Sequence, residues 1–345
     1  MKRKLSLALA CIAGTTMLFG CGKSEVNSEA AVEDTLSVVT TVFAPYDFAK
    51  EIVGDLGEVT MLVPPAAESH SYEPTPQDII KIQNCDVFVY TGGHSDEWVT
   101  DLLGSVGNDD IKVVKMLDTV ELLEEEIVEG MEHNHHHEHE EEAETEEHEH
   151  EHEHEEVAET EEHHHEHEEV EYDEHVWTSP KNAIEITKAI KEAIVSCDVA
   201  NKETYEAHTT EYISELEALD KAFEDVIAGG VRDEIIFADR FPLRYFVEAY
   251  DLDYYAAFPG CSADTEPSAA TVAFLIDKVK EDEIPAVFHI EMSNEKMADT
   301  ICEETGAKKL LFNACHNVSK EEFEEGITYV GIMKDNVEVL KEALY

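Results

Sequence analysis

Residues 201–228 predict a single long helix, because they contain no Pro or Gly and carry apolar side chains at helical spacing. Gly229 and Gly230 follow and end the pattern. At 1.5 Å per residue this helix is about 40 Å long, enough to run along two folded lobes. A rigid helix of this length limits how far two lobes can hinge against each other.

On both sides of this helix, short β-branched runs alternate with helical stretches, which is the rhythm of a parallel α/β sheet. The predicted strands are residues 36–42, 59–63, 87–90, 111–116, 234–237, 254–257, 286–290 and 309–312. The predicted helices between them include one that runs through Ala49 and residues 77–83, 243–250, 268–281 and 296–305. We therefore predict an α/β fold of two parallel-sheet lobes, residues 36–200 and 230–345, joined by a linking helix over 201–229, with the ligand site in the cleft.

The first residues have the form of an export signal: basic Lys2-Arg3-Lys4 precedes an apolar run that ends in Leu-Phe-Gly-Cys. This ending resembles a lipobox, so we predict a signal peptide over 1–20 and acylation of Cys21. The polar residues 21–35 then form a flexible tether from a membrane to the folded body. The chain is expected outside the cytoplasm, and no later apolar stretch is long enough to cross a bilayer.

The formal net charge of −56 disfavours nucleic acids and anionic membrane surfaces, and suits a cationic ligand. Residues 132–174 contribute 22 acidic residues, 13 of the 19 histidines, and no Lys or Arg. Such a composition cannot bury enough apolar surface to fold, so we predict a disordered His/Glu-rich insertion in the N-terminal lobe.

The first histidine that stands out is His70, in the segment PPAAESHSYEP over residues 64–74. A predicted strand ends here in a rigid loop, which presents His70 at the carboxyl edge of the sheet, where open α/β sheets bind ligands. The second is His175, in DEHVWTSP over residues 173–180, just before a helix expected to begin near Pro180. His94, in a turn, and His208, on the linking helix, are expected to have solvated or packing roles.

These two motifs, with a His/acid-rich insertion between them and a long linking helix after them, resemble the cluster A-I solute-binding lipoproteins for zinc and manganese. The resemblance covers essentially the whole chain after the signal. It implies that His70 and His175 are the two metal ligands of the N-terminal lobe. It also implies an ABC permease and its ATPase as partners, attachment to the membrane by a lipid anchor, and a monomeric receptor.

The C-terminal lobe departs from this family pattern. Relatives carry a ligating His or Glu in an HDAFxYF-like segment, whereas the matching text FADRFPLRYF, residues 237–246, has neither. We predict His316, in NACHNVS over residues 313–319, as the third ligand, because it follows the last predicted strand where relatives carry a late Asp. Asp239 is a candidate to complete the site. His289 and Glu291 leave their strand towards the same edge, and either could be a ligand or support one. Glu68 and Glu291 could orient ligating imidazoles without touching metal.

The His/Glu insertion has metal chemistry of its own. Imidazoles two residues apart, as in His148, His150, His152 and His154, can chelate a borderline cation without prior folding. Ordering such a segment costs entropy, so its sites should be weaker than a preformed pocket. We expect it to scavenge, buffer or sense zinc.

Five of the seven cysteines remain after Cys11 and Cys21 are set aside, so at least one is unpaired. The best candidate pair is Cys261 with Cys315, because both lie in loop-like segments near candidate ligands. Five thiols in about 300 residues are too few to form a disulfide framework on which the fold depends.

The predicted function is high-affinity zinc capture for an importer, since imidazole-rich sites favour zinc over manganese. Manganese or iron is the alternative cargo if His316 is not a ligand. A surface zinc buffer or adhesin would use the same residues. No zinc-protease helix, nucleophile elbow or phosphate-binding loop is present in the sequence, so an enzyme is not expected.

Overall fold

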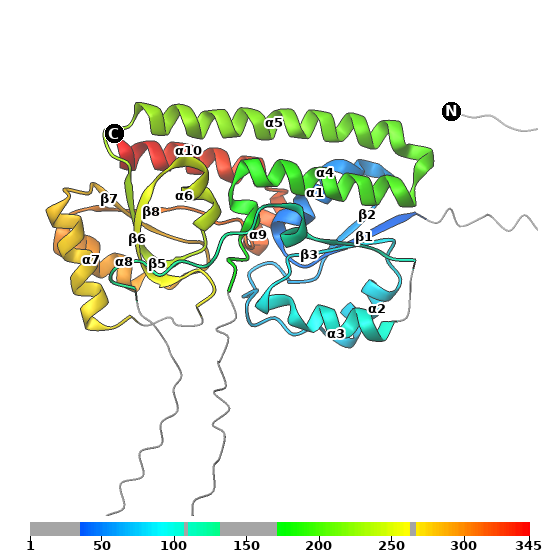
Figure 1. Ribbon diagram of the computed structural model, residues 1–345, viewed down its shortest axis with the longest axis horizontal. Helices are drawn as coiled ribbons and strands as arrows, with labels where there is room; N and C mark the ends of the chain where they lie inside the picture. The colour runs from blue at the N-terminus through cyan, green and yellow to red at the C-terminus, as the bar shows by residue number, and fades with distance from the viewer. Residues whose placement is uncertain (1–34, 107–109, 132–170, 263–266) are drawn as a thin grey trace, which may run out of the picture. The chain divides into compact units, whose positions relative to one another are not determined.

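The computed structural model describes residues 35–106, 110–131, 171–262 and 267–345 (Figure 1). They form two lobes, each with a four-stranded parallel sheet covered by helices, and a long helix that passes over both. The predicted fold class is therefore confirmed. Among the described helices, none is both long enough and apolar enough to cross a membrane.

The N-terminal sheet has the strand order β2-β1-β3-β4. Its strands are β1 (Leu36–Thr40), β2 (Gly57–Met61), β3 (Val87–Tyr90) and β4 (Lys112–Lys115). Its helices are α1 (Phe43–Val53), α2 (Pro76–Gln83), α3 (Glu97–Val106) and α4 (Pro180–Cys197). Thr75 caps α2 reciprocally with Asp78, and Pro76 occupies the first turn. Helix α4 begins at the predicted Pro180.

The C-terminal sheet repeats the arrangement with the order β6-β5-β7-β8. Its strands are β5 (Glu234–Phe241), β6 (Asp253–Pro259), β7 (Ala286–His289) and β8 (Lys308–Leu311). Its helices are α6 (Arg244–Tyr250), α7 (Ala269–Glu281), α8 (Lys296–Thr305), α9 (Lys320–Glu325) and α10 (Tyr329–Leu344). The pairing of β5 with β6 shifts register between Phe237 and Arg240, so β5 continues past its predicted end through an irregularity.

Helix α5 (Lys202–Gly229) is the predicted linking helix, and it runs along the top of both lobes in Figure 1. Its buried side chains recur every three or four residues: Tyr205, Thr209, Tyr212, Leu216, Leu219, Phe223 and Val226. Helix α5 packs against α1 and α4 of one lobe and against α10, which lies beneath it over the other lobe. Both lobes therefore share this helix as part of their cores.

The predicted insertion is too long at its C-terminal end. Residues 171–174 belong to the folded body: Tyr172 forms an antiparallel bridge with Glu124, and Asp173 and Glu174 are buried. The carboxylate of Glu174 accepts the backbone N–H of Ser95 at 3.0 Å. These acids continue the charged run in the sequence, but tertiary contacts bury them. The rest of the segment, including His148, His150, His152 and His154, lies outside the described residues.

The predicted disulfide is wrong, since Cys261 and Cys315 are both free thiols in the structure. Cys261 follows β6 and Cys315 follows β8, and these strands form opposite edges of the C-terminal sheet. Three strand spacings separate the edges by about 14 Å. A disulfide requires its two Cα atoms to lie within about 7 Å, so the topology keeps the two residues apart.

Candidate metal centre

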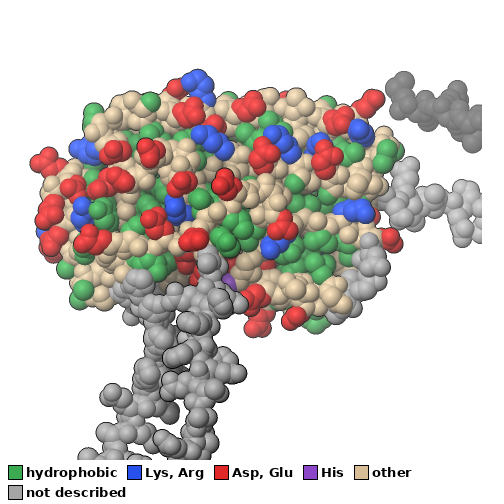
Figure 2. Space-filling view, in the orientation of Figure 1, with side chains coloured by type: hydrophobic (Ala, Val, Ile, Leu, Met, Phe, Trp, Pro, Cys, Tyr) green, Lys and Arg blue, Asp and Glu red, His purple; other side chains and the backbone are tan. Residues whose placement is uncertain are grey.

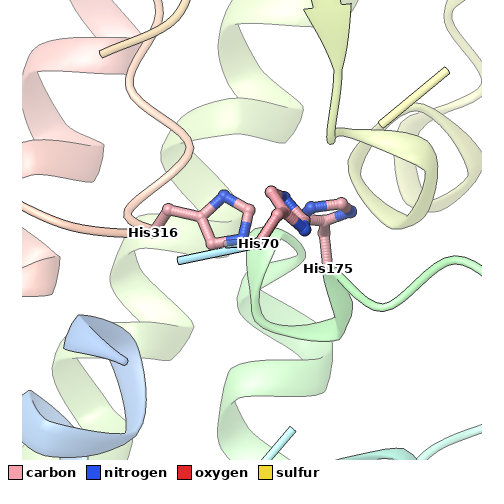
Figure 3. A group of neighbouring side chains, drawn as sticks. All are labelled: His70, His175 and His316. Atoms are coloured by element: carbon pink, nitrogen blue, oxygen red, sulfur yellow. The ribbon is translucent and has the colours of Figure 1, made fainter. Parts of the chain in front are cut away.

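Three histidines meet between the two lobes: His70, His175 and His316. One ring nitrogen from each lies within 4.8 Å of the others. Their ring centroids are 5.6 Å (His70–His175), 4.9 Å (His70–His316) and 4.6 Å (His175–His316) apart (Figure 3). The N-terminal lobe supplies two of the rings and the loop after β8 supplies the third. The structure thus brings together the three histidines predicted from the sequence.

His70 is held by a short hydrogen bond on its ring. Its Nδ1 lies 2.9 Å from the Ser95 hydroxyl, which comes from the turn after β3. The loop that carries His70 is anchored further along by Tyr72, whose hydroxyl donates to Asp78 at 2.9 Å in the first turn of α2. Ser95 and Tyr72 therefore fix the ring and the backbone of this ligand candidate.

His175 is completely buried and is oriented by Asp173. One carboxylate oxygen of Asp173 accepts the His175 backbone N–H at 2.8 Å and lies 3.1 Å from the ring Nδ1. The other ring nitrogen, Nε2, is buried and has no hydrogen-bond partner. When Nδ1–H donates to Asp173, Nε2 carries a free lone pair, which is the arrangement in which histidine binds metal. An unpartnered buried nitrogen beside two other imidazoles is a donor arrangement that could hold a cation.

His316 is positioned mainly through its backbone. Its N–H donates to Glu291 at 2.9 Å, and its carbonyl accepts the N–H of Phe43 in the other lobe at 3.1 Å. The ring packs on Trp177, with centroids 4.9 Å apart. The Trp177 indole in turn donates to the Ala314 carbonyl at 2.8 Å. The loop after β8 is thus fastened on both sides of the ligand candidate.

The electrostatics of the group favour neutral imidazoles. Burial, His175 and Arg240 lower the pKa of His70 to about 4. Burial and the two neighbouring histidines hold the pKa of His316 well below its usual value. Burial opposes the ionised form of His175 as well, but the Asp173 carboxylate raises the pKa of that ring. At neutral pH, His70 and His316 therefore present lone pairs rather than protons, as metal binding requires.

The other predicted ligand residues lie outside this group. The carboxylate of Asp239 accepts the backbone N–H of Arg240 at 2.9 Å and of Ile290 at 3.3 Å. It therefore stabilises the irregular part of β5 against the residue that follows β7. The ring Nδ1 of His289 lies 3.1 Å from the Ile290 carbonyl. Glu291 contributes indirectly, because it holds the backbone of His316. The prediction of Asp239 as a fourth ligand is therefore not supported by its position.

A seam of hydrogen bonds joins the lobes around the histidines. The backbone N–H of Ala66 donates to the Val318 carbonyl at 2.8 Å, and the side-chain amide of Asn317 donates to the carbonyls of Pro64 and Ala67, each at 2.8 Å. Figure 3 shows the three rings facing one another in the middle of this region. His175 is therefore buried between the lobes, whereas His70 and His316 remain partly exposed. Figure 2 shows a histidine side chain that reaches the surface between the two lobes.

Four residues that support the site were not assigned roles from the sequence: Ser95, Asp173, Trp177 and Arg240. Asp173 could have been assigned, because an acid two residues before a candidate ligand can orient its ring. Trp177 is fully buried, and its ring also covers His316. No local pattern signals Ser95 or Arg240, because each reaches the site only through the packing of elements that are distant in the sequence.

The model for the ZnuA family, described as "Zinc-uptake complex component A periplasmic", matches residues 38–343. The chain belongs to this family. The chain is therefore related to substrate-binding transport components that work outside the cytoplasm, and the resemblance predicted from its motifs is confirmed. Over its whole length it is 35% identical to the high-affinity zinc uptake system protein ZnuA of Bacillus subtilis, covering 99% of that protein. It is 30% identical to the zinc-binding lipoprotein AdcA of Streptococcus pneumoniae, of which it spans 61%.

Solved structures of ZnuA-family proteins share this architecture. The metal-dependent lipoprotein YcdH of Bacillus subtilis is 32% identical, with a TM-score of 0.70 over 90% of this chain and 100% of that one. The Zn(II)-bound ZnuA-like domain of Streptococcus pneumoniae AdcA is 27% identical, with a TM-score of 0.69 over 90% of this chain and 99% of that domain. A Mn-bound periplasmic protein of Candidatus Liberibacter asiaticus is 19% identical and shows a common fold.

Proposed function

We propose that this protein is an extracytoplasmic receptor that captures zinc with high affinity and delivers it to an ABC permease and its ATPase. The observation that carries the proposal is the enclosed group of His70, His175 and His316, with the unpartnered Nε2 of His175 facing the other rings. The printed names of the ZnuA and AdcA relatives, a zinc uptake protein and a zinc-binding lipoprotein, support the same cargo.

The donor set favours zinc over manganese. Imidazole nitrogen suits zinc, whereas carboxylate and water oxygens suit manganese. Zinc prefers four ligands in a tetrahedron, and three converging imidazoles supply most of that shell. Manganese or iron remains the alternative cargo, and it would require more oxygen donors than this group offers.

The enclosure favours a carrier over an enzyme. A catalytic zinc keeps an open coordination position for water and substrate. Here the loops of both lobes surround the rings, which suits a cargo that is held and later released.

We infer that the protein is not an enzyme and acts as a monomer, with acylation of Cys21 tethering it to the membrane. We further infer that the histidines of residues 132–170 buffer zinc beside the receptor site. A surface adhesin or a zinc buffer without a transporter is the competing function.

Zinc titration against a competing chelator tests the proposal. The protein should lack residues 132–170, so that only the receptor site binds, and should retain Asp173 and Glu174. We expect one tight zinc per chain. Each of His70→Ala, His175→Ala and His316→Ala should weaken it by about 100-fold, since about 10–16 kcal/mol of binding is shared among four ligands.

His94→Ala is the matched control, because His94 is an exposed ring that bonds only to Glu97 on the surface. Zinc affinity should not change in this variant. A parent protein without a tight site would refute the receptor proposal. Tighter binding of manganese than of zinc would reassign the cargo. Growth of the producing cell in zinc-poor medium, with and without the gene for the neighbouring permease, separates a receptor from an adhesin.

A further inference from the structure

The acidic side chains around the histidines are almost all committed to other partners. Asp173 accepts a hydrogen bond from the backbone of His175, and Glu174 accepts one from the backbone of Ser95. Asp239 accepts the backbone N–H of Arg240 in the irregular part of β5. Glu291 accepts the backbone N–H groups of Ala314 and His316. These carboxylates accept backbone N–H groups at 2.7–3.3 Å. Each would have to leave a buried backbone N–H without an acceptor in order to reach a cation, which is unfavourable.

Glu68 is the exception among them. It lies two residues before His70 on the same loop, and its side chain is 43% exposed. One carboxylate oxygen lies 3.4 Å from the His70 backbone nitrogen, and the other lies 3.3 Å from Nη2 of Arg240. Both distances are long for charge-assisted hydrogen bonds, which are normally about 2.7–2.9 Å. Glu68 is thus the acid beside the histidines that is held most loosely.

Arg240 approaches Glu68 from the other lobe. The irregularity in β5 gives this strand an extra residue against β6 just before Arg240, and Asp239 holds the Arg240 backbone N–H. The Arg240 side chain is only 15% exposed. Its guanidinium therefore lies at the boundary between the lobes, a position reached through the strand irregularity.

Glu68 and Arg240 line two cavities. A small recess of about 20 Å³ is lined by both residues together with His316 and Asn317. A larger cavity of about 170 Å³ is lined by the same two residues together with Asp239 and Glu295. The ion pair thus borders both the recess beside His316 and a larger acidic space that can attract a cation.

We propose that Glu68 is the fourth ligand of the bound cation, and that Arg240 holds its carboxylate away from the three histidines until the cation arrives. This inference rests on the proposed metal-binding function and deepens it. In the metal-free protein, Arg240 supplies the positive charge beside Glu68. On binding, the cation takes over that role, Glu68 turns towards the histidines, and Arg240 is left facing Asp239 and Glu295 across the larger cavity.

The energies are compatible with this exchange. A half-exposed ion pair is worth about 0.2–1 kcal/mol, so it can orient Glu68 without trapping it. A zinc–carboxylate bond completes a tetrahedral shell at about 2.0–2.2 Å and is much stronger than this pair. Arg240 therefore lowers affinity only slightly, while it gates the movement of Glu68 towards the histidines.

The test is a double-mutant cycle on the full chain with Glu68→Gln, Arg240→Gln and the double variant. All variants carry Trp98→Phe, so that Trp177 is the only tryptophan in the chain. Zinc is added against a competing chelator, and binding is followed by the fluorescence of Trp177, which reports locally because its ring packs on His316. Glu68→Gln should weaken zinc binding at least about tenfold. Arg240→Gln should tighten zinc binding about 1.4- to 5-fold, because the energy of the Glu68–Arg240 ion pair no longer opposes binding. In the Glu68→Gln background, Arg240→Gln should change the affinity by less than in the parent.

Glu248→Gln is the matched control, because it removes a half-exposed carboxylate from Arg244 on α6, away from the histidines. Zinc affinity should stay unchanged in this variant. Equal tightening by Arg240→Gln in both backgrounds would mean simple charge repulsion and would overturn the gate. Unchanged affinity in Glu68→Gln, with the parent still tight, would overturn Glu68 as a ligand and leave the receptor function intact. A crystal structure with zinc would show directly whether Glu68 bonds the cation or stays on Arg240.

Discussion

The two lobes use the same sheet topology but contribute differently to the histidine group. In both, the segment that follows the last strand of the sheet supplies an imidazole: His175 in the first lobe and His316 in the second. The loop after the second strand supplies His70 in the first lobe, whereas the corresponding loop in the second lobe carries Cys261. One scaffold thus gives two ligand candidates on one side and one on the other.

The manner in which the rings are held differs too. The first lobe orients its rings through side chains, since Ser95 and Asp173 bond to ring nitrogens. The second lobe orients His316 through its main chain, which Glu291 and Phe43 fix. The first lobe can therefore be tuned by changing one side chain at a time, whereas the second depends on the integrity of a whole loop. Three predictions test this contrast.

The largest expected effect concerns the joint between the lobes. Asp47 of α1 accepts the backbone N–H of Tyr329 at the start of α10 and the hydroxyl of Tyr212 on α5. Burial, opposed by the Tyr329 hydrogen bond, raises the pKa of Asp47 to about 7. Between about pH 4 and pH 7 the folded protein therefore holds a proton at Asp47 that the unfolded chain has lost. The contribution of Asp47 to the free energy of unfolding is therefore complete below about pH 4 and is lost as the pH rises to about 7.

Asp47→Asn should remove that dependence. A shift of about three units corresponds to about 4 kcal/mol, so we expect the variant to gain about 2–4 kcal/mol of unfolding free energy relative to the parent between pH 4 and pH 7.5. Urea unfolding at several pH values measures this difference. Separate unfolding transitions for the two lobes in the parent would contradict this prediction, because the contacts of Asp47 with Tyr329 and Tyr212 would then not couple the lobes.

The next effect tests the main-chain support of the second lobe. In the parent, the two carboxylate oxygens of Glu291 accept the backbone N–H groups of Ala314 and His316, one each. In Glu291→Gln, the amide has one oxygen, so its NH₂ group would face one of these buried N–H donors. We expect a loss of about 2–3 kcal/mol in unfolding free energy, together with weaker zinc binding. Urea unfolding and chelator-competed titration measure the two quantities. Glu342→Gln, at an exposed carboxylate paired with Lys308, is the control and should change neither.

The smallest effect tests the side-chain support of the first lobe. Asp173→Asn keeps the shape of the side chain but removes the negative charge beside the His175 ring. Zinc affinity should fall about 10- to 100-fold, or about 1.4–2.7 kcal/mol, with little change in stability. Loss of stability as large as in Glu291→Gln would contradict the contrast, because both lobes would then rely on the same kind of support.

Much of this architecture could be predicted because the strands and the long helix are read from local periodicity. His70, His175 and His316 could be predicted because parallel strands end at one edge, so loops distant in sequence meet there. The irregularity at Asp239 could not, since an extra residue in a strand leaves no periodic signal. The burial of Asp173 and Glu174 depends on Tyr245 of α6 and on Ser95 in the turn after β3, which are distant in the sequence. The contact of Arg240 with Glu68 could not be predicted either, because the two residues belong to different lobes.

The seam between the lobes has a consequence for unloading. Asn317, Val318 and Ala314 are tied to the first lobe by hydrogen bonds at 2.8 Å on both sides of His316. Thermal opening must break several of these bonds together, so we expect an isolated loaded molecule to retain its cargo for a long time. Under the proposed function, release is a property of the encounter with the importer, which would have to separate the loop after β8 from Trp177. The rate of zinc delivery would then follow the rate of docking rather than the affinity of the site.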